Sequence, residues 1–581
     1  MRQAEEKQFE THDGVRLFYR HWPAASATAD RAIILFHRGH EHSGRLQHVV
    51  DELNLPEFAM FAWDARGHGK SPGERGDSPA FAASVKDVDT IVRHVSKTHG
   101  VPLDDIAVIA QSVGAVLVST WAHDYAPRVR CLVLASPAFK VKLYVPFARS
   151  GLALQYKLRG NFFVNSYVKA KFLTHDPERI RSYETDPLIT RAISVRILLA
   201  LYEAGERVVA DAQAIRLPTQ LLISGADWVV HRGPQDEFYE RLGSAVKERH
   251  VLEGFYHDTL GERDRAPVMG NIRDFIGRMF GAPQAEAALL DADQRGYTRD
   301  EEVRLAQPLA ALSPKNLQFA MVRTSMRSLG RLSRGIRLGL ETGFDSGSTL
   351  DYVYRNVAEG ITPVGRMIDR SYLDSIGWRG IRVRKENLGR AIASAAQRLA
   401  ATGRPLRIAD IAAGHGRYVL EAVEKLRKRP DSILLRDYSD INVRDGTRLI
   451  AEKKLDGIAR FIKADAFDEE GVAAIDPKPT VGIVSGLYEL FPSNTQVGAS
   501  LRGFARAVQP GGFLIYTGQP WHPQLELIAR TLTSHRAGAA WVMRRRTQLE
   551  MDQLVRQAGF EKIDQWTDDW GIFTVSLAAR V

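Results

Sequence analysis

The stretch "VIAQSVGAV", residues 108–116, decides the fold of the first half of the chain. An apolar run ends at Ala110, Ser112 follows, and Gly114 and Ala115 then permit a tight turn into a helix. A serine on such a strand-to-helix turn resembles a nucleophile elbow, whose pattern is G-x-S-x-G. Ala110 replaces the first glycine and adds only one methyl group. An ordinary turn between a strand and a helix has the same pattern, so the interpretation depends on the rest of the chain.

The composition predicts a soluble globular protein, since 44% of the 581 residues are hydrophobic and 25% are charged. The sequence contains no apolar run that could span a bilayer, and "MRQAEEKQFE" lacks the apolar core of a signal peptide. One cysteine, Cys131, excludes an internal disulfide framework and favours a reducing, cytoplasmic compartment. The net charge of +10 comes without a nucleic-acid-binding motif, so no nucleic acid partner is expected. Nothing in the sequence sets an oligomeric state.

Short apolar strands alternate with helical stretches in both halves, which predicts two α/β domains. The first half contains "RAIILFH", "FAMFAWDA", "IAVIAQS", "VRCLVLASPA" and "TQLLISGAD". The second half contains "LRIADIAAG", "SILLRDYS", "RFIKADAF", "TVGIVSGLY" and "GGFLIYTG". We predict one domain over residues 1–281, a linker over 282–315, a helical preface over 316–399 and a second domain over 400–581.

Two further residues complete a hydrolytic constellation with Ser112. Acyl transfer requires a nucleophile, a base, and an acid that orients the base. Asp227 lies at the end of the strand in "LLISGADWVV", and His257 follows on a loop in "LEGFYHDTL". The chain order Ser112, Asp227, His257 is the order found in α/β-hydrolases.

Two backbone amides are also needed to stabilise an oxyanion. Val113 would supply one, and the loop "ILFHRGHEHSGR", residues 34–45, would supply the other through Gly39. The same loop carries four side chains of metal-ligating types, His37, His40, Glu41 and His42. Alternating positions on one loop rarely converge on an ion, so we expect no metal site.

Five motifs in order resemble the monoglyceride lipase and lysophospholipase-like group of α/β-hydrolases, also called serine aminopeptidase S33. They are "HRGHEHSGR", "WDARGHGKSPGERG", "AQSVG", "SGADWVV" and "GFYHDTL", and they cover roughly residues 8–280. The resemblance implies an α/β-hydrolase fold and the following site: nucleophile Ser112, acid Asp227, base His257, and oxyanion amides of Gly39 and Val113.

Two details of these motifs set further expectations. The family has His-Gly where this chain has His37 and Arg38, which places a bulky side chain beside the oxyanion loop. In "DARGHGKS", we expect Asp64, Arg66 and His68 to tie loops together rather than to catalyse.

The stretch from about residue 138 to 210 is expected to form a helical cap over Ser112. It is rich in aromatic and basic residues, as in "KLYVPFARSGLALQYKLRG". Apolar cap residues would suit an acyl chain, and basic ones an anionic head group or peripheral contact with an anionic membrane surface. The alternative is that these residues only pack the cap against the core.

In the second half, "LRIADIAAGHGRYVLEAVEKL", residues 406–426, predicts a strand, a glycine turn and a helix. Glycines at such a turn let the backbone approach a ligand at the helix N-terminus. Val419 stands where a dinucleotide-binding fingerprint needs a third glycine. The next strands end in Asp437, in "SILLRDYS", and Asp465, in "IKADAFD".

These features resemble class I S-adenosylmethionine-dependent methyltransferases over about residues 400–581. The resemblance implies a Rossmann-like fold that ends in an antiparallel hairpin, with S-adenosylmethionine as the cofactor. It implies these cofactor-binding residues: Asp410, Ala412, Gly414, Gly416, Asp437, Asp465 and Ala466. The alternative is a vestigial nucleotide-binding fold that binds nothing.

The methyl acceptor has no diagnostic motif, and the candidates to line its pocket are Tyr488, Glu489, Gln519 and His522. Overall we predict a bifunctional enzyme, a serine hydrolase fused to a methyltransferase. The hydrolase would cleave a lipid-like ester such as a monoacylglycerol or a lysophospholipid. The alternatives are a non-lipid esterase or peptidase, and a hydrolase that a non-catalytic, S-adenosylmethionine-sensing domain regulates.

Overall fold

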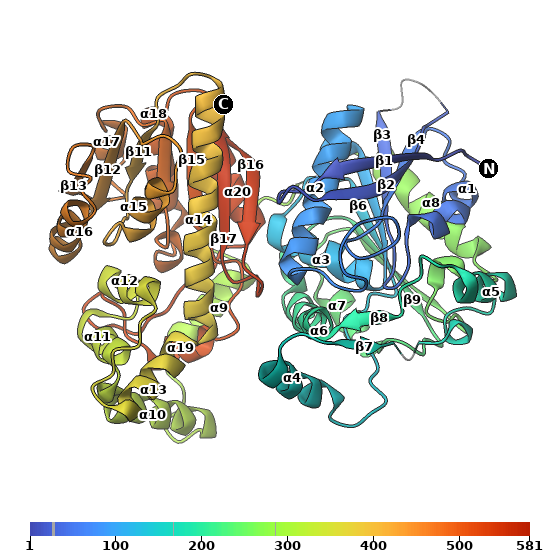
Figure 1. The fold of residues 1–581 in the computed structure, drawn as a ribbon, viewed down its shortest axis with the longest axis horizontal. Helices are drawn as coiled ribbons and strands as arrows, with labels where there is room; N and C mark the ends of the chain where they lie inside the picture. The colour runs from blue at the N-terminus through green and yellow to red at the C-terminus, as the bar shows by residue number, and fades with distance from the viewer. Residues whose placement is uncertain (26–29, 167, 285) are drawn as a thin grey trace. The chain divides into compact units, whose positions relative to one another are not determined.

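The computed structural model describes residues 1–25, 30–166, 168–284 and 286–581 (Figure 1). The chain divides into two compact units, Met1–Ala287 and Ala288–Val581. The predicted cap and linker each include one residue, 167 and 285, that lies outside the described residues.

The first unit is built on an eight-stranded sheet in the order β1-β2-β4-β3-β5-β6-β9-β10 (Figure 1). The strands are β1 Glu5–Glu10, β2 Arg16–Trp22, β3 Arg31–Phe36, β4 Phe58–Trp63, β5 Ile106–Gln111, β6 Cys131–Ala135, β9 Thr219–Ser224 and β10 Lys247–Leu252. Strand β2 pairs antiparallel with β1 and β4, and all pairs from β4 onward are parallel. This is the predicted α/β-hydrolase fold.

Helices cover both faces of this sheet, which is why its central strands are apolar throughout. Along β5, Val108 and Ala110 pack into the core with α2 and α3, and Ala107 and Ile109 pack with α1 and α8. The four helices are α1 Gln47–Leu53, α2 Phe81–His99, α3 Val113–Tyr125 and α8 Ala266–Gly281. Ala110 is fully buried, so this core accommodates the methyl group that replaces the elbow glycine.

Among its described residues, the region predicted as a cap contains three α-helices, a short 3-10 helix at Ala170–Phe172 and a two-stranded antiparallel sheet. Its elements are α4 Ala148–Arg159, β7 Phe163–Asn165, α5 Pro177–Thr185, β8 Ala192–Ser194 and α6 Val195–Ala210. The strand pair β7–β8 was not expected, because three residues are too few to show an alternating pattern. Helix α7, Gly233–Arg241, follows β9.

The second unit is built on a seven-stranded sheet in the order β13-β12-β11-β14-β15-β17-β16. The strands are β11 Arg407–Asp410, β12 Ser432–Asp437, β13 Ala459–Lys463, β14 Val481–Val484, β15 Phe513–Gly518, β16 Phe560–Thr567 and β17 Thr574–Arg580. The first five are parallel, and β17 runs antiparallel between β15 and β16. This is a Rossmann-like sheet that ends in the predicted hairpin.

Helices cover both faces of the second sheet as well. One face packs against α14 Ile376–Ala401, α15 Arg417–Glu424 and α16 Asp440–Glu452; the other packs against α17 Glu469–Ala473, α18 Asn494–Ala507 and α20 Gln548–Gln557. Long α14 runs along the sheet in Figure 1. The remaining helices are α9 Tyr297–Ala306, α10 Pro314–Arg327, α11 Arg334–Thr342, α12 Gly347–Arg355, α13 Pro363–Leu373 and α19 Leu525–Thr531. Among the described residues, no helix has the length and apolar character that crossing a bilayer requires.

Candidate functional sites

Ser112 lies on a sharp turn between β5 and α3, with φ 56° and ψ −116°. Its amide donates to Ala135 O at 2.9 Å, which ties the turn to the neighbouring strand β6. A Cβ at Gly114 would lie 2.5 Å from His37 O, so only glycine lets the helix start this close to the end of β3. The sequence therefore places a strained serine at the carboxyl end of the sheet.

Ser112, His257 and Asp227 form a continuous chain of hydrogen bonds. Ser112 Oγ lies 2.7 Å from His257 Nε2, and His257 Nδ1 lies 2.8 Å from Asp227 Oδ2. The amides of Val229 and Val230 donate to Asp227 Oδ1. Burial alone would raise the pKa of Asp227, but His257 and these amides outweigh it and hold the pKa below its usual value. This geometry lets His257 take a proton from the serine hydroxyl.

The two residues predicted to supply oxyanion amides lie side by side. Val113 opens α3, so its N–H is one of those that have no partner within the helix. A Cβ at Gly39 would lie 3.1 Å from Val113 Cγ2, which shows how closely the loop after β3 approaches this turn. The structure thus brings the two predicted residues together at the end of β5.

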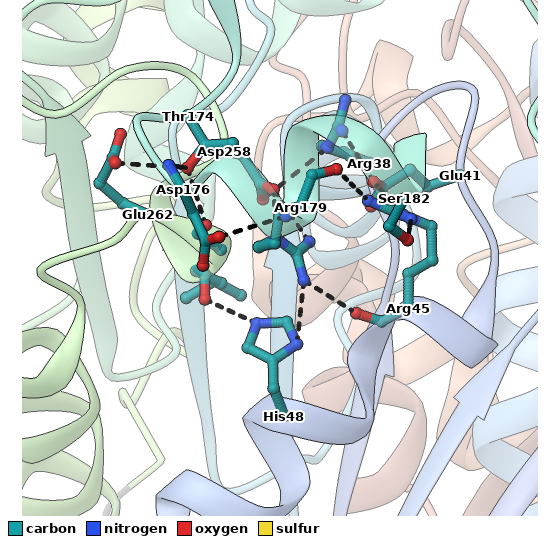
Figure 2. Close-up of polar contacts among 12 residues, drawn as sticks. Arg38, Glu41, Arg45, His48, Thr174, Asp176, Arg179, Ser182, Asp258 and Glu262 are labelled. Atoms are coloured by element: carbon teal, nitrogen blue, oxygen red, sulfur yellow. Dashed lines mark hydrogen bonds and ion pairs between the residues drawn. The ribbon is translucent and has the colours of Figure 1, made fainter. Parts of the chain in front are cut away.

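Arg38 stands at the position where the family has glycine, and its buried guanidinium group belongs to an ion-pair network (Figure 2). Arg38 Nη2 donates to Glu41 Oε1 at 2.7 Å, and Arg45 Nε donates to the same oxygen at 2.7 Å. Arg38 Nε also lies 3.8 Å from Asp258 Oδ1. The bulky side chain is thus neutralised by carboxylates.

The network continues into the cap through Arg179 of α5 (Figure 2). Arg179 donates to Asp258 Oδ2 from Nε at 3.0 Å and from Nη2 at 2.9 Å, and it contacts His48 Nδ1 at 3.1 Å. Burial and then the Arg179 charge lower the pKa of His48 to about 4. The neutral ring can therefore donate from Nε2 to Leu260 O while Nδ1 accepts from Arg179.

Sequence reasoning did not include these supporting residues. Gln111, directly before Ser112, donates to His257 O and to Asp258 Oδ1, both at 3.2 Å. Asp258 directly follows His257, and an acidic residue next to the predicted base could have indicated its supporting role. Arg179 had no signal, because it reaches Asp258 from a separate cap helix.

The histidines of loop 34–45 enter separate contacts. His37 Nε2 accepts from the amide of Ala65, and His42 Nε2 lies 2.9 Å from Asp186 Oδ2. His40 is half-buried and has a φ of 68°. In the described part of the chain, no group of three or more histidine, cysteine or acidic residues is arranged to hold a metal ion.

The motif "DARGHGKS" ties loops together, as expected. Asp64 accepts from the amides of Ser43 and Lys70 at 2.6 and 2.7 Å. Arg66 pairs with Asp13 and Asp87.

A cavity of about 1000 Å³ in the second unit, here named the glycine-loop cavity, joins most of the predicted cofactor-binding residues. Six of them line it: Ala412, Gly414, Gly416, Asp437, Asp465 and Ala466. Gly414 and Gly416 have φ values of 56° and 73°, which a residue with a side chain rarely adopts. Part of the predicted helical preface, including Ser346–Ser348, also lines this cavity.

Asp437 organises the loop while keeping capacity for a ligand. Its Oδ2 accepts from the Gly414 amide at 3.0 Å, and its Oδ1 accepts from the Ser439 amide and Asn442 Nδ2, each at 3.0 Å. A carboxylate has about four acceptor sites, so one on Oδ2 remains for a ligand hydroxyl.

Asp410 was predicted to bind the cofactor, but it does not line this cavity. It is fully buried beneath the loop, where it accepts from the Ala412 amide and from the Tyr418 hydroxyl. Burial raises the pKa of Asp410 to about 7. Its contacts hold the turn from inside.

A second cavity, of about 210 Å³, adjoins the first and is here named the tryptophan cavity. Three of the predicted acceptor-pocket residues line it, namely Glu489, Gln519 and His522. Tyr488, the fourth predicted residue, lines neither this cavity nor the glycine-loop cavity. The Tyr488 ring packs in the core with α18, where its hydroxyl donates to Ser500 Oγ at 3.0 Å.

A family model described as "Putative methyltransferase" matches residues 272–580, which is more than half of the chain. The chain belongs to this family. A second model, described as "Serine aminopeptidase, S33", matches residues 27–264. The protein is therefore a fusion of an α/β-hydrolase with a domain of this methyltransferase family, as the sequence motifs predict.

Relatives agree with this division. "Uncharacterized protein YnbC" of Escherichia coli is 57% identical over 98% of this chain and 98% of its own length. The monoacylglycerol lipase of Mycolicibacterium smegmatis is 25% identical over 47% of this chain and 96% of its own length. The monoglyceride lipase of Rattus norvegicus is 28% identical over 42% of this chain and 80% of its own length. The hydrolase half is thus related to monoglyceride lipases.

The network behind the triad predicts a large effect of Arg179→Met. We expect the free energy of unfolding of the first unit to fall by about 3 kcal/mol, because the buried Asp258 carboxylate loses its closest cation. Urea unfolding of the full chain, followed by circular dichroism, measures this loss. The control is Arg181→Met, which changes an exposed residue of the same helix. The same free energy of unfolding in the two variants would contradict the prediction.

Proposed function

We propose that the first unit is a serine hydrolase that cleaves a carboxylic ester of a lipid-like substrate, such as a monoacylglycerol or a lysophospholipid. The observation that carries this is the hydrogen-bonded chain Ser112–His257–Asp227. His257 accepts the hydroxyl proton as Ser112 Oγ attacks the ester carbonyl, and it then returns the proton to the leaving alcohol. Water releases the acyl group from Ser112 by the same steps.

The amides of Gly39 and Val113 stabilise the oxyanion in this proposal. The lipid-like substrate class rests on the names of the two lipase relatives. A non-lipid esterase or a peptidase would use the same triad, and rates on p-nitrophenyl esters of increasing chain length and on aminoacyl p-nitroanilides separate these possibilities. Preference for the anilides would overturn the lipid proposal.

Fluorophosphonate labelling tests the nucleophile directly. We expect the wild type to be labelled and Ser112→Ala to lose the label, with kcat on a p-nitrophenyl ester lowered by a factor on the order of 10⁶. Ser119→Ala is the matched control, because the Ser119 hydroxyl donates to Ala115 O on its own helix. A labelled Ser112→Ala variant would refute the assignment.

We also propose that the cap contacts an anionic membrane surface and that the protein acts in the cytoplasm. Leu154 and Leu158, one turn apart on α4, are 60% and 74% exposed, and Phe147, directly before the helix, is 88% exposed. Lys157 and Arg159 are exposed near them. An apolar stripe beside cations suits a bilayer interface. The single cysteine, which is buried, supports the cytoplasmic location.

Vesicle sedimentation tests the membrane proposal. We expect the wild type to co-sediment with phosphatidylglycerol vesicles and the double variant Leu154→Ser, Leu158→Ser to remain in the supernatant, because it removes the apolar stripe. The control Val246→Ser changes an exposed apolar residue outside the cap. No sedimentation of the wild type would reject membrane contact.

We propose further that the second unit is an S-adenosylmethionine-dependent methyltransferase. The group fits the residues present, since the glycine-loop cavity is large enough and Asp437 keeps one free acceptor site for a ribose hydroxyl. Gly414 and Gly416 let the main chain approach the ligand, and Ala466 with Phe467 offers an apolar wall to a ring. When bound, the cofactor supplies an electrophilic methyl group.

Isothermal titration calorimetry with S-adenosylmethionine tests this proposal. We expect Asp437→Ala to bind it at least about tenfold more weakly, because a hydrogen bond to a charged acceptor is worth roughly 1.5–3 kcal/mol. Asp456→Ala, at an exposed position outside the cavity, should bind as the wild type does. Absence of binding by the wild type would reject the cofactor.

A further inference from the structure

The tryptophan cavity has the composition of a site for a small molecule. Its walls are mainly apolar, and Trp378 of α14 stacks with Trp541 at a centroid distance of 6.3 Å and an angle of 25°. Phe573 and Met543 add to the apolar lining. Five residues line both this cavity and the glycine-loop cavity: Asp345, Leu350, Arg384, Gly486 and Leu490. A molecule in the tryptophan cavity would therefore lie next to the proposed cofactor.

The volume limits the size of that molecule. At about 210 Å³, the cavity is smaller than the roughly 300 Å³ at which sites for drug-sized ligands begin. An apolar protein cavity of about 150 Å³ binds benzene. The tryptophan cavity thus has room for one ring with small substituents.

Four polar atoms of residues that line the cavity have no hydrogen-bond partner within the described residues: Glu489 Oε2, Trp541 Nε1, Tyr372 Oη and Arg384 Nε. Glu489 and Trp541 are 7% and 8% exposed. Glu489 Oε1 is paired with Arg384 Nη1 at 3.4 Å, which leaves Oε2 as the free acceptor of that carboxylate. A buried polar atom without a partner destabilises the protein, so a ligand that pairs with it gains affinity.

The chemistry of these atoms restricts the ligand. Glu489 Oε2 needs a hydrogen-bond donor. The N–H groups of Trp541 and Arg384 need an acceptor, and the Tyr372 hydroxyl can pair with either. A carboxylate ligand offers no donor and would add a negative charge beside Glu489. A protonated amine would add a second buried cation beside Arg384. A neutral hydroxyl group both donates and accepts, and it adds no charge.

His522 is consistent with a hydroxyl ligand. Its Nδ1 accepts from the Gln524 amide at 3.0 Å, and burial lowers the pKa of His522 to about 4. A neutral imidazole whose Nδ1 accepts carries its proton on Nε2. His522 therefore offers a second donor on the cavity wall, and Glu489 remains the acceptor for the ligand's proton.

We propose that the tryptophan cavity binds a single-ring phenol, whose hydroxyl donates to Glu489 Oε2 and accepts from the donors of the opposite wall. A phenol with a pKa near 10, like that of tyrosine, keeps its proton at pH 7. This inference rests on the proposed methyltransferase function only for the role of the phenol as methyl acceptor. The binding site itself stands without that function.

Calorimetric titration of the full chain with three matched probes tests the proposal: 4-ethylphenol, ethylbenzene and 4-ethylbenzoate. We expect 4-ethylphenol to bind at least about tenfold more tightly than either of the others. Of the three probes, only 4-ethylphenol can donate a hydrogen bond to the Glu489 carboxylate. Equal affinity for 4-ethylphenol and ethylbenzene, or tighter binding of the benzoate, would overturn the inference. So would an absence of 4-ethylphenol binding.

Variants locate the site. Glu489→Leu should weaken 4-ethylphenol binding at least about tenfold, and Trp541→Phe, which keeps an aromatic wall and should fold, about threefold. Tyr488→Phe is the matched control. The Tyr488 hydroxyl donates to Ser500, so its removal should leave the affinity for 4-ethylphenol unchanged. Wild-type affinity in both cavity variants would overturn the proposal. Binding of S-adenosylmethionine to the wild type is measured in a separate titration. If the wild type binds 4-ethylphenol but not S-adenosylmethionine, methyl transfer is rejected and the phenol site stands.

Discussion

The strained backbone of Ser112 is the constraint on which the first unit depends. A positive φ at a residue other than glycine costs of order 1–3 kcal/mol, and it persists only where the surroundings enforce it. Here the Ser112 amide donates to Ala135 O, and the Ser112 carbonyl accepts from the Ala138 amide. The end of β6 and the main chain directly after it therefore hold both sides of the turn. With the turn fixed, Oγ meets His257 at hydrogen-bond distance, and Val113 begins the helix beside Gly39.

The buried charges behind the triad link the cap to the catalytic loop. Taking an ion out of water costs several kcal/mol unless it is paired, and here Glu41 and Asp258 each have arginine partners. Arg179 belongs to the cap, whereas Asp258 follows His257 directly. The ion pair that neutralises Asp258 therefore also sets the position of α5 relative to the loop that carries the base. Arg38, at a position where the family has glycine, completes this set of charges.

Both units build their candidate sites by the same geometric rule, that ligands meet the carboxyl ends of parallel strands. Ser112 and Asp227 follow β5 and β9. In the second unit, Gly414 and Asp465 follow β11 and β13, and Asp437 is the last residue of β12. In the second unit the rule extends to Glu489, which follows β14. The aromatic walls of the tryptophan cavity come from α14 and from the segment before α20, so helices and loops complete what the sheet edge begins.

By itself, the sequence determined the two α/β folds and the positions of most candidate residues. Strand ends are local features, so "AQSVG", "SGADWVV" and "IAAGHGR" locate Ser112, Asp227 and Gly414 without knowledge of the packing. Only the tertiary structure decided which way a side chain points and what reaches it from far along the chain. Tyr488 and Glu489 are neighbours in sequence, yet one packs in the core and the other lines a cavity. Arg179 meets Asp258 across 79 residues, and Trp541 meets Trp378 across a longer separation. Such contacts depend on how separate elements pack, which no local pattern of residues encodes.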